Sequence, residues 1–171
     1  MMTLAYLNEN DKAYGLAGMV VSLAALDAMD RVAYVELDSD GPMVTFSQEF
    51  YNPGIGAISI KESWNHLCNN YYITAGMVLG NLMARSNVRW QKGVPDDVAA
   101  LVREEILKEG RETCSLEDDE VAAIYRRVNS IMRQIFHNPQ VAPAVADIAT
   151  EISRRRHVSG RELSEIVRQL L

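Results

Sequence analysis

The chain contains little cysteine and no apolar run long enough to suggest a membrane anchor. Two cysteines, Cys68 and Cys114, in 171 residues are too few for the disulfide framework of a small secreted domain. The uncharged segment 13–26 is shorter than the roughly 20 apolar residues that a membrane span needs. The first residues lack the basic start and cleavage pattern of a secretory signal. We therefore expect a cytoplasmic protein with reduced thiols and no membrane partner.

The chain also contains fewer basic residues than acidic residues. Lys and Arg number 17 against 23 Asp and Glu, which gives a formal net charge of −6. General nucleic-acid coats and membrane-surface binders accumulate positive charge, so both classes are disfavoured, although a local basic patch is compatible with this balance. The 48% hydrophobic composition is that of an ordinary globular protein. A chain of this length can bury a sufficient core without disulfide bonds or a structural metal ion.

No catalytic motif is present. None of the serines stands in a nucleophile-elbow pattern. The three histidines, His66, His137 and His157, have no partners that the sequence reveals, so nucleophilic catalysis is unsupported. An enzyme is therefore less expected than a non-enzymatic protein, and we expect no cofactor.

What the sequence does contain is helical periodicity. Between residues 121 and 136 apolar residues recur at alternating steps of three and four, and Tyr125 and Met132 widen the stripe. Such a stripe is typical of a helix that packs against other helices. The stripe positions are Val121, Ile124, Val128, Ile131 and Ile135.

The predicted fold class is α+β, predominantly α. We expect a helix over about 11–30, a β-hairpin from 32–37 and 43–47, and a long helix over about 58–85. A C-terminal array of about four helices then follows, opened by Pro95, by a capping-box-like Ser115–Asp118, by Pro143 and by Ser159 with Glu162. We expect one compact domain over 1–171, with a sub-domain joint at 86–94, where periodicity is lost.

Small residues mark two places where helices can approach closely. Gly15, Gly18 and Ser22 lie in the first helix, and Gly76 and Gly80 form a second small-residue notch in the long helix. The predicted hairpin is a separate matter: a lone two-stranded hairpin is marginal in water, and its edges are unpaired. We therefore expect the hairpin to pack on helices or to pair with a second copy in a homodimer.

The long helix also carries a candidate metal site. Glu62, His66 and Asn70 are four residues apart, which places a carboxylate, an imidazole and an amide on one face. A neighbouring helix would have to complete the ligand set. The alternative interpretation is a solvated or hydrogen-bonded helix face.

A candidate phosphate or ligand site lies in the loop before that helix. Gly54 and Gly56 could present backbone amides at a helix N-terminus. The dinucleotide fingerprint is incomplete because Ser59 stands at the third glycine position. Ordinary loop chemistry explains the same residues.

The C-terminal helix pair is a candidate nucleic-acid site. Arg154, Arg155 and Arg156 precede a capped helix that carries Arg161, an arrangement resembling a helix-turn-helix unit. Glu162 and Glu165 on that helix would oppose phosphate contact. An exposed basic helix end is the alternative interpretation.

The aromatic cluster of Trp64, Tyr71 and Tyr72 fits either a pocket wall or the core, and helical spacing favours the core.

Our leading functional hypothesis is an intracellular interaction, scaffold or regulatory protein, because the chain builds packing surface and lacks a convergent catalytic set. The alternatives are a metal-binding protein or enzyme using Glu62 and His66, and a DNA-binding regulator using the C-terminal helix pair.

Overall fold

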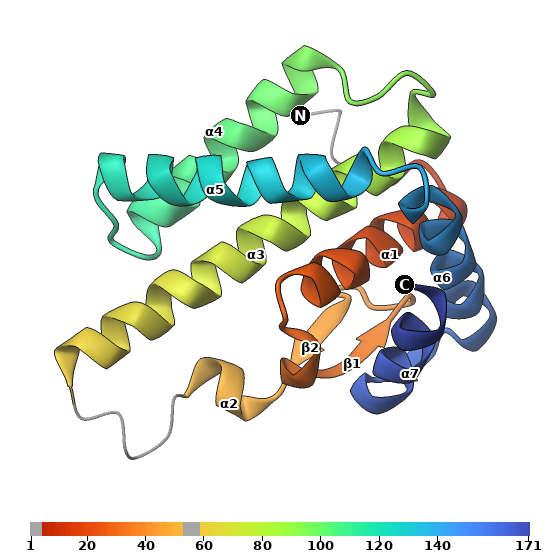
Figure 1. Ribbon diagram of the computed structural model, residues 1–171, viewed down its shortest axis with the longest axis horizontal. Coiled ribbons are helices and arrows are strands. Elements are labelled where there is room, and N and C mark those ends of the chain that lie inside the picture. The colour runs from red at the N-terminus through yellow and green to blue at the C-terminus, as the bar shows by residue number, and fades with distance from the viewer. Residues whose placement is uncertain (1–4, 53–58) are drawn as a thin grey trace.

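The computed structural model describes residues 5–52 and 59–171, and helices dominate it (Figure 1). In chain order the elements are α1 (Glu9–Ala25), a 3₁₀ turn (Met29–Arg31), β1 (Val32–Glu36), β2 (Val44–Phe46), α2 (Gln48–Tyr51), α3 (Ile60–Arg89), α4 (Asp96–Glu112), α5 (Asp118–Phe136), α6 (Val141–Arg155), β3 (His157–Ser159) and α7 (Gly160–Leu170). The predicted class is confirmed: a helix, a hairpin and a long helix precede four C-terminal helices.

The sheet has a third strand that the sequence did not predict. Its order is β2-β1-β3, and both pairings are antiparallel. Val35 stands opposite Val44 on one side and Val158 on the other, and it is fully buried. Because β3 covers the second edge of β1, the hairpin is not left as an isolated pair, which removes part of the reasoning for a homodimer. The homodimer itself stays a prediction.

Helices α1 and α3 pack at very short range through their small residues. A Cβ atom added to Gly18 would lie 2.2 Å from the carbonyl oxygen of Gly80, and one added to Gly80 would lie 1.8 Å from the Ser22 Oγ. Ser22 in turn donates its hydroxyl to the Gly18 carbonyl at 2.8 Å. The small-residue notches predicted on the two helices therefore fit into each other.

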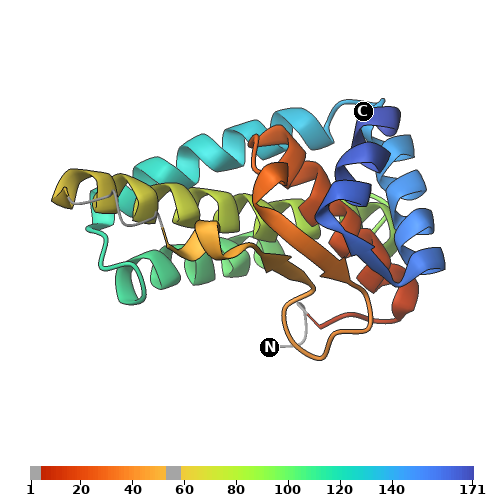
Figure 2. The ribbon, with the colours of Figure 1, turned by 90° about the horizontal axis from the view of Figure 1, so that it is seen from below.

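The buried apolar residues form two clusters with α3 between them. One cluster joins α1 to the sheet, α6 and α7, and the other joins α3 to α4 and α5. Ile135 and Phe136 at the end of α5 pack against both clusters. Figure 2 shows the sheet, α6 and α7 gathered at one end of the molecule, while the first turns of α3 extend to the other end.

A buried ion pair ties the start of α1 to the end of α3. The Arg85 Nε and Nη2 atoms each donate to one Asp11 oxygen at 2.8 Å, and both side chains are almost completely buried. Arg85 Nη2 and Arg89 Nη1 also donate to the Ala5 carbonyl at 3.0 and 2.9 Å. These contacts hold the segment before α1 against α3.

Several element boundaries differ from the prediction. α1 ends at Ala25 rather than near Asp30, because the chain turns through Asp27, whose φ is 53°. α3 continues to Arg89, through the first four residues of the expected joint 86–94. α6 begins at Val141, before Pro143.

The helix caps were predicted with mixed success. At α5 the Glu120 side chain accepts from the Glu117 N–H at 2.8 Å, so the cap is Glu117 rather than Ser115. The cap predicted for the last helix is confirmed, since Ser159 and Glu162 form a reciprocal capping box at the start of α7.

Candidate functional site

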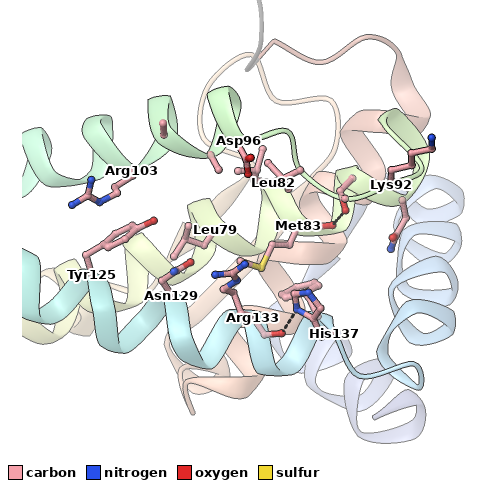
Figure 3. A pocket seen from close by; sticks show the side chains of 17 residues that line it. Leu79, Leu82, Met83, Lys92, Asp96, Arg103, Tyr125, Asn129, Arg133 and His137 are labelled. Carbon is pink, nitrogen blue, oxygen red and sulfur yellow. Dashed lines mark hydrogen bonds between the residues drawn. The ribbon is translucent and has the colours of Figure 1, made fainter.

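A cleft lies between α3, α4 and α5. Its volume is about 580 Å³, which lies within the range of about 300–1,000 Å³ typical of small-molecule pockets. It lies beside the α3–α4 connection, which contributes Lys92, Gly93 and Val94. Figure 3 shows α5 along one wall and α4 along the other, with α3 behind them.

The α5 wall presents four polar side chains in a row. Tyr125, Asn129, Arg133 and His137 are four residues apart and all line the cleft (Figure 3). A helix rises about 1.5 Å per residue, so successive members are separated by about 6 Å along the wall. The apolar stripe of the same helix packs into the core, and Tyr125, at the edge of this stripe, begins the row that faces the cleft.

The floor of the cleft is apolar. Leu79, Leu82 and Met83 come from α3, and Val94 and Phe136 add apolar surface near the ends of the cleft. Leu79 and Leu82 belong to the buried cluster beneath. The cleft therefore combines an apolar base with polar walls, which is the usual composition of a ligand site.

Basic groups outnumber carboxylates in the cleft lining. Lys92, Arg103 and Arg133 share the lining with one carboxylate, Asp96, and Arg103 also pairs with Glu104 at 3.5 Å, whereas the whole chain carries a formal net charge of −6. Within the described ranges no ion pair joins Lys92 or Arg133 to a carboxylate. The local charge is thus opposite in sign to that of the molecule, and it favours an anion.

Two interactions position groups on these walls. The Arg103 guanidinium carbon lies 5.8 Å from the centroid of the Tyr125 ring. Burial raises the pKa of the Tyr125 phenol, while the charges of Arg103 and Arg133 act in the opposite direction. His137 donates Nδ1–H to the Arg133 carbonyl at 2.6 Å, because a carbonyl can only accept. This bond leaves the Nε2 atom of His137 for other partners.

The predicted metal ligands Glu62 and His66 lie outside this cleft. Glu62 is exposed on the first turn of α3. The His66 Nε2 lies 3.2 Å from the Asn70 Nδ2, which also donates to the Phe50 carbonyl at 2.7 Å. His66 and Asn70 therefore help to join α3 to α2. In the part of the chain that the structure describes, no three His, Cys, Asp or Glu residues are grouped to hold a metal ion.

The other predicted sites are also separate from the cleft. Gly54 and Gly56 lie outside the described residues. The four arginines proposed for nucleic acid each contact a carboxylate of the same chain, so their charge is largely compensated. The pairs are Arg154–Glu151, Arg155–Glu151, Arg155–Glu162, Arg156–Glu9, Arg156–Asp38 and Arg161–Glu165.

The aromatic cluster divides between core and surface. Tyr71 is buried and donates its hydroxyl to the Ile106 carbonyl at 2.7 Å, and burial raises its pKa to about 12. Tyr72 is half-buried beneath Arg127, whose guanidinium carbon lies 5.4 Å from the ring centroid. Trp64 is exposed. The predicted core role is thus met by Tyr71, and none of the three lines the cleft.

Sequence reasoning missed the cleft residues because they come from three separate elements. One signal was available: Tyr125, Asn129, Arg133 and His137 share one helical face beside the apolar stripe. No signal in the sequence indicated that α4 would pack opposite that face.

No helix in the described ranges has the length and apolar character needed to cross a bilayer. Comparison with known proteins gives no match: no protein-family model, no curated protein and no solved structure resembles this chain.

Proposed function

We propose that the protein binds a small anionic ligand with an apolar part in the α3–α4–α5 cleft. The observation that carries the proposal is the charge reversal: Lys92 and Arg133 line the cleft without an ion-pair partner among the described residues, Asp96 is the one carboxylate in the lining, and the chain as a whole is acidic. An anion in the cleft would gain charge-assisted hydrogen bonds, and its apolar part would cover Leu79 and Met83.

Arg133 is the residue we expect to contribute most. It lies midway between Asn129 and His137 on the α5 wall, and its guanidinium offers a planar set of donors to a carboxylate, sulfonate or phosphate. A hydrogen bond to a charged group contributes about 1.5–3 kcal/mol. Since about 1.4 kcal/mol is a factor of ten in affinity, losing the Arg133 contact would weaken binding roughly 10- to 100-fold.

The test uses anilinonaphthalene sulfonate, a fluorescent aromatic anion. We expect saturable fluorescence enhancement with the wild-type protein, a roughly 10- to 100-fold weaker dissociation constant for Arg133→Gln, and weakening with added salt. The matched control is Arg126→Gln, which removes the same charge from an exposed position of α5 outside the cleft. Equal binding by wild type, Arg133→Gln and Arg126→Gln would overturn the proposal.

A second candidate function, protein interaction, is favoured by exposed apolar side chains near the start of α3. On α3, Ile60 is 91% exposed and Trp64, one turn later, 39%. Contiguous exposed apolar residues often mark interaction sites. Ile60→Ser with Trp64→Ser is expected to abolish self-association or partner binding while leaving sulfonate binding in the cleft unchanged; unaltered association would remove this candidate.

We also propose a reducing, cytoplasmic setting. Cys68 and Cys114 are both free thiols in the structure, and proteins of oxidising compartments seldom leave cysteines unpaired. Incubation of the protein in a glutathione redox buffer tests this: a Cys68–Cys114 bridge that raises the unfolding temperature would contradict it.

A further inference from the structure

We infer that the ligand of the α3–α4–α5 cleft is a nucleoside monophosphate, and this inference rests on the proposed function. The order of groups along α5 carries it. From Tyr125 to His137 the wall presents an aromatic ring, an amide, a guanidinium and an imidazole, one turn apart. Such an order matches a ligand that is aromatic at one end and anionic at the other.

The aromatic end of the cleft lies at Tyr125. Its ring is half-buried, and the Arg103 guanidinium stands 5.8 Å from the ring centroid on the opposite wall. Aromatic rings and guanidinium planes are the two surfaces on which proteins stack nucleobases. Because Arg103 already lies over the Tyr125 ring, a flat heterocycle placed here would extend this stack rather than lie between the two groups, with Leu79 on the floor of the cleft.

Asn129 supplies the amide that would recognise the base through hydrogen bonds. It stands one turn from Tyr125, is half-buried and lines the cleft. Among the described residues its amide has no hydrogen-bond partner. A carboxamide carries a donor and an acceptor side by side, and it can pair with the N6–H and N7 of adenine as asparagine does in DNA recognition. We therefore take adenosine monophosphate as the first nucleotide to test.

The anionic end lies at Arg133, His137 and Lys92. Arg133 is eight residues from Tyr125, about 12 Å along the helix, which is the span of a ligand made of a base, one ribose and one phosphate. The bond from His137 Nδ1 to the Arg133 carbonyl leaves Nε2 for the ligand. Arg133 and Lys92 together carry more positive charge than one carboxylate requires, and this charge suits the nearly −2 of a phosphate monoester.

Asp96 fits the same assignment. It is the one carboxylate in the lining and lies at the first position of α4, seven residues before Arg103. A carboxylate accepts hydrogen bonds from ribose hydroxyls, as acidic residues do in dinucleotide-binding folds. The sugar would lie between the base at Arg103 and the phosphate at Lys92, opposite Asp96.

The experiment is competition against bound anilinonaphthalene sulfonate, with adenosine monophosphate, guanosine monophosphate, adenosine and inorganic phosphate as separate competitors. We expect adenosine monophosphate to compete at least about tenfold better than adenosine or phosphate alone, because stacking and charge contacts act on one molecule. Tyr125→Leu is expected to weaken the nucleotide about tenfold and to leave inorganic phosphate unchanged. Arg133→Gln is expected to reduce the nucleotide to the level of adenosine, and Arg126→Gln to change nothing.

The outcomes separate the two proposals. If sulfonate binding depends on Arg133 but neither nucleotide competes, the cleft is an anion site and the nucleotide inference is wrong. If phosphate alone competes as well as the nucleotide, the base is not recognised and the inference is also wrong. If sulfonate binding does not depend on Arg133, the proposed function fails and the inference fails with it. Circular dichroism of each variant confirms that it is folded.

Discussion

Replacing the buried carboxylate of Asp11 by the isosteric amide of asparagine should strongly destabilise the protein. Asp11 accepts two hydrogen bonds from Arg85, each 2.8 Å long, and one from the Leu7 N–H at 2.9 Å. Both members of the pair are at most 4% exposed. Asp11→Asn keeps the shape of the side chain and removes its charge, so Arg85 keeps its place but loses the carboxylate that compensates it.

The expected magnitude follows from this burial. Breaking a buried ion pair by removing one partner costs about 3–5 kcal/mol, because a charge then remains in a poorly solvated place. A domain of this size unfolds with a free energy of about 5–15 kcal/mol, so the loss is a large fraction of the total. At roughly 2–4 °C per kcal/mol, the unfolding temperature should fall by roughly 6–20 °C. Asp147→Asn, at an exposed position of α6, is the control and should change stability by less than about 0.5 kcal/mol.

The assay is urea denaturation followed by circular dichroism from neutral to acid pH. Burial acts to raise the pKa of Asp11, but its hydrogen bonds with Arg85 and Leu7 hold the pKa below the ordinary value. Its contribution is therefore complete above about pH 4, the ordinary aspartate pKa, and is lost as the pH falls through the lower folded-state pKa. A cost below about 1 kcal/mol, or a double variant with Arg85→Met whose effect is the sum of the two single effects, would refute the reasoning.

Three further predictions concern packing, thiols and assembly. Gly80→Ala should destabilise by about 1–3 kcal/mol in thermal unfolding, because its Cβ would lie 2.6 Å from the Gly18 carbonyl oxygen; Gly41→Ala, whose nearest neighbour is 3.9 Å away, should be nearly neutral, and equal effects would contradict this. Burial raises the pKa of both the Cys68 and Cys114 thiols, so alkylation near neutral pH should be slower than for glutathione and should rise above about pH 9; reaction as fast as glutathione would count against it. Light scattering should give twice the chain mass of 19.1 kDa if the predicted homodimer forms, whereas 19.1 kDa at every concentration would exclude it.

The helices were predictable because their signals are local. The stripe from Val121 to Ile135 and the Ser159–Glu162 cap each depend on residues close together in the sequence. The structure has a helix, α5, over the stripe and a capping box at Ser159 and Glu162. The close approach of α1 and α3 was also indicated, since Gly18 and Gly80 leave room for backbone contact.

The parts that sequence reasoning missed depend on distant residues. β3 has three residues, and it is a strand because Val158 pairs with Val35. α3 runs beyond residue 85 into the expected joint, where Arg85 and Arg89 contact Ala5 and Asp11 from the other end of the chain. The cleft has the same origin, because its α5 wall becomes a site only when Arg103 and Asp96 of α4 stand across from it.

The most direct test of the cleft assignment is chemical-shift mapping of the labelled protein titrated with adenosine monophosphate. The account predicts that the largest shifts fall on the methyl groups of Leu79, Leu82 and Met83 and on the side-chain amide of Asn129, all of which line the cleft, and that Arg133→Gln removes them. Shifts centred instead on the apolar surface around Val21, Ile135 and Leu171, or no shifts at all, would contradict it.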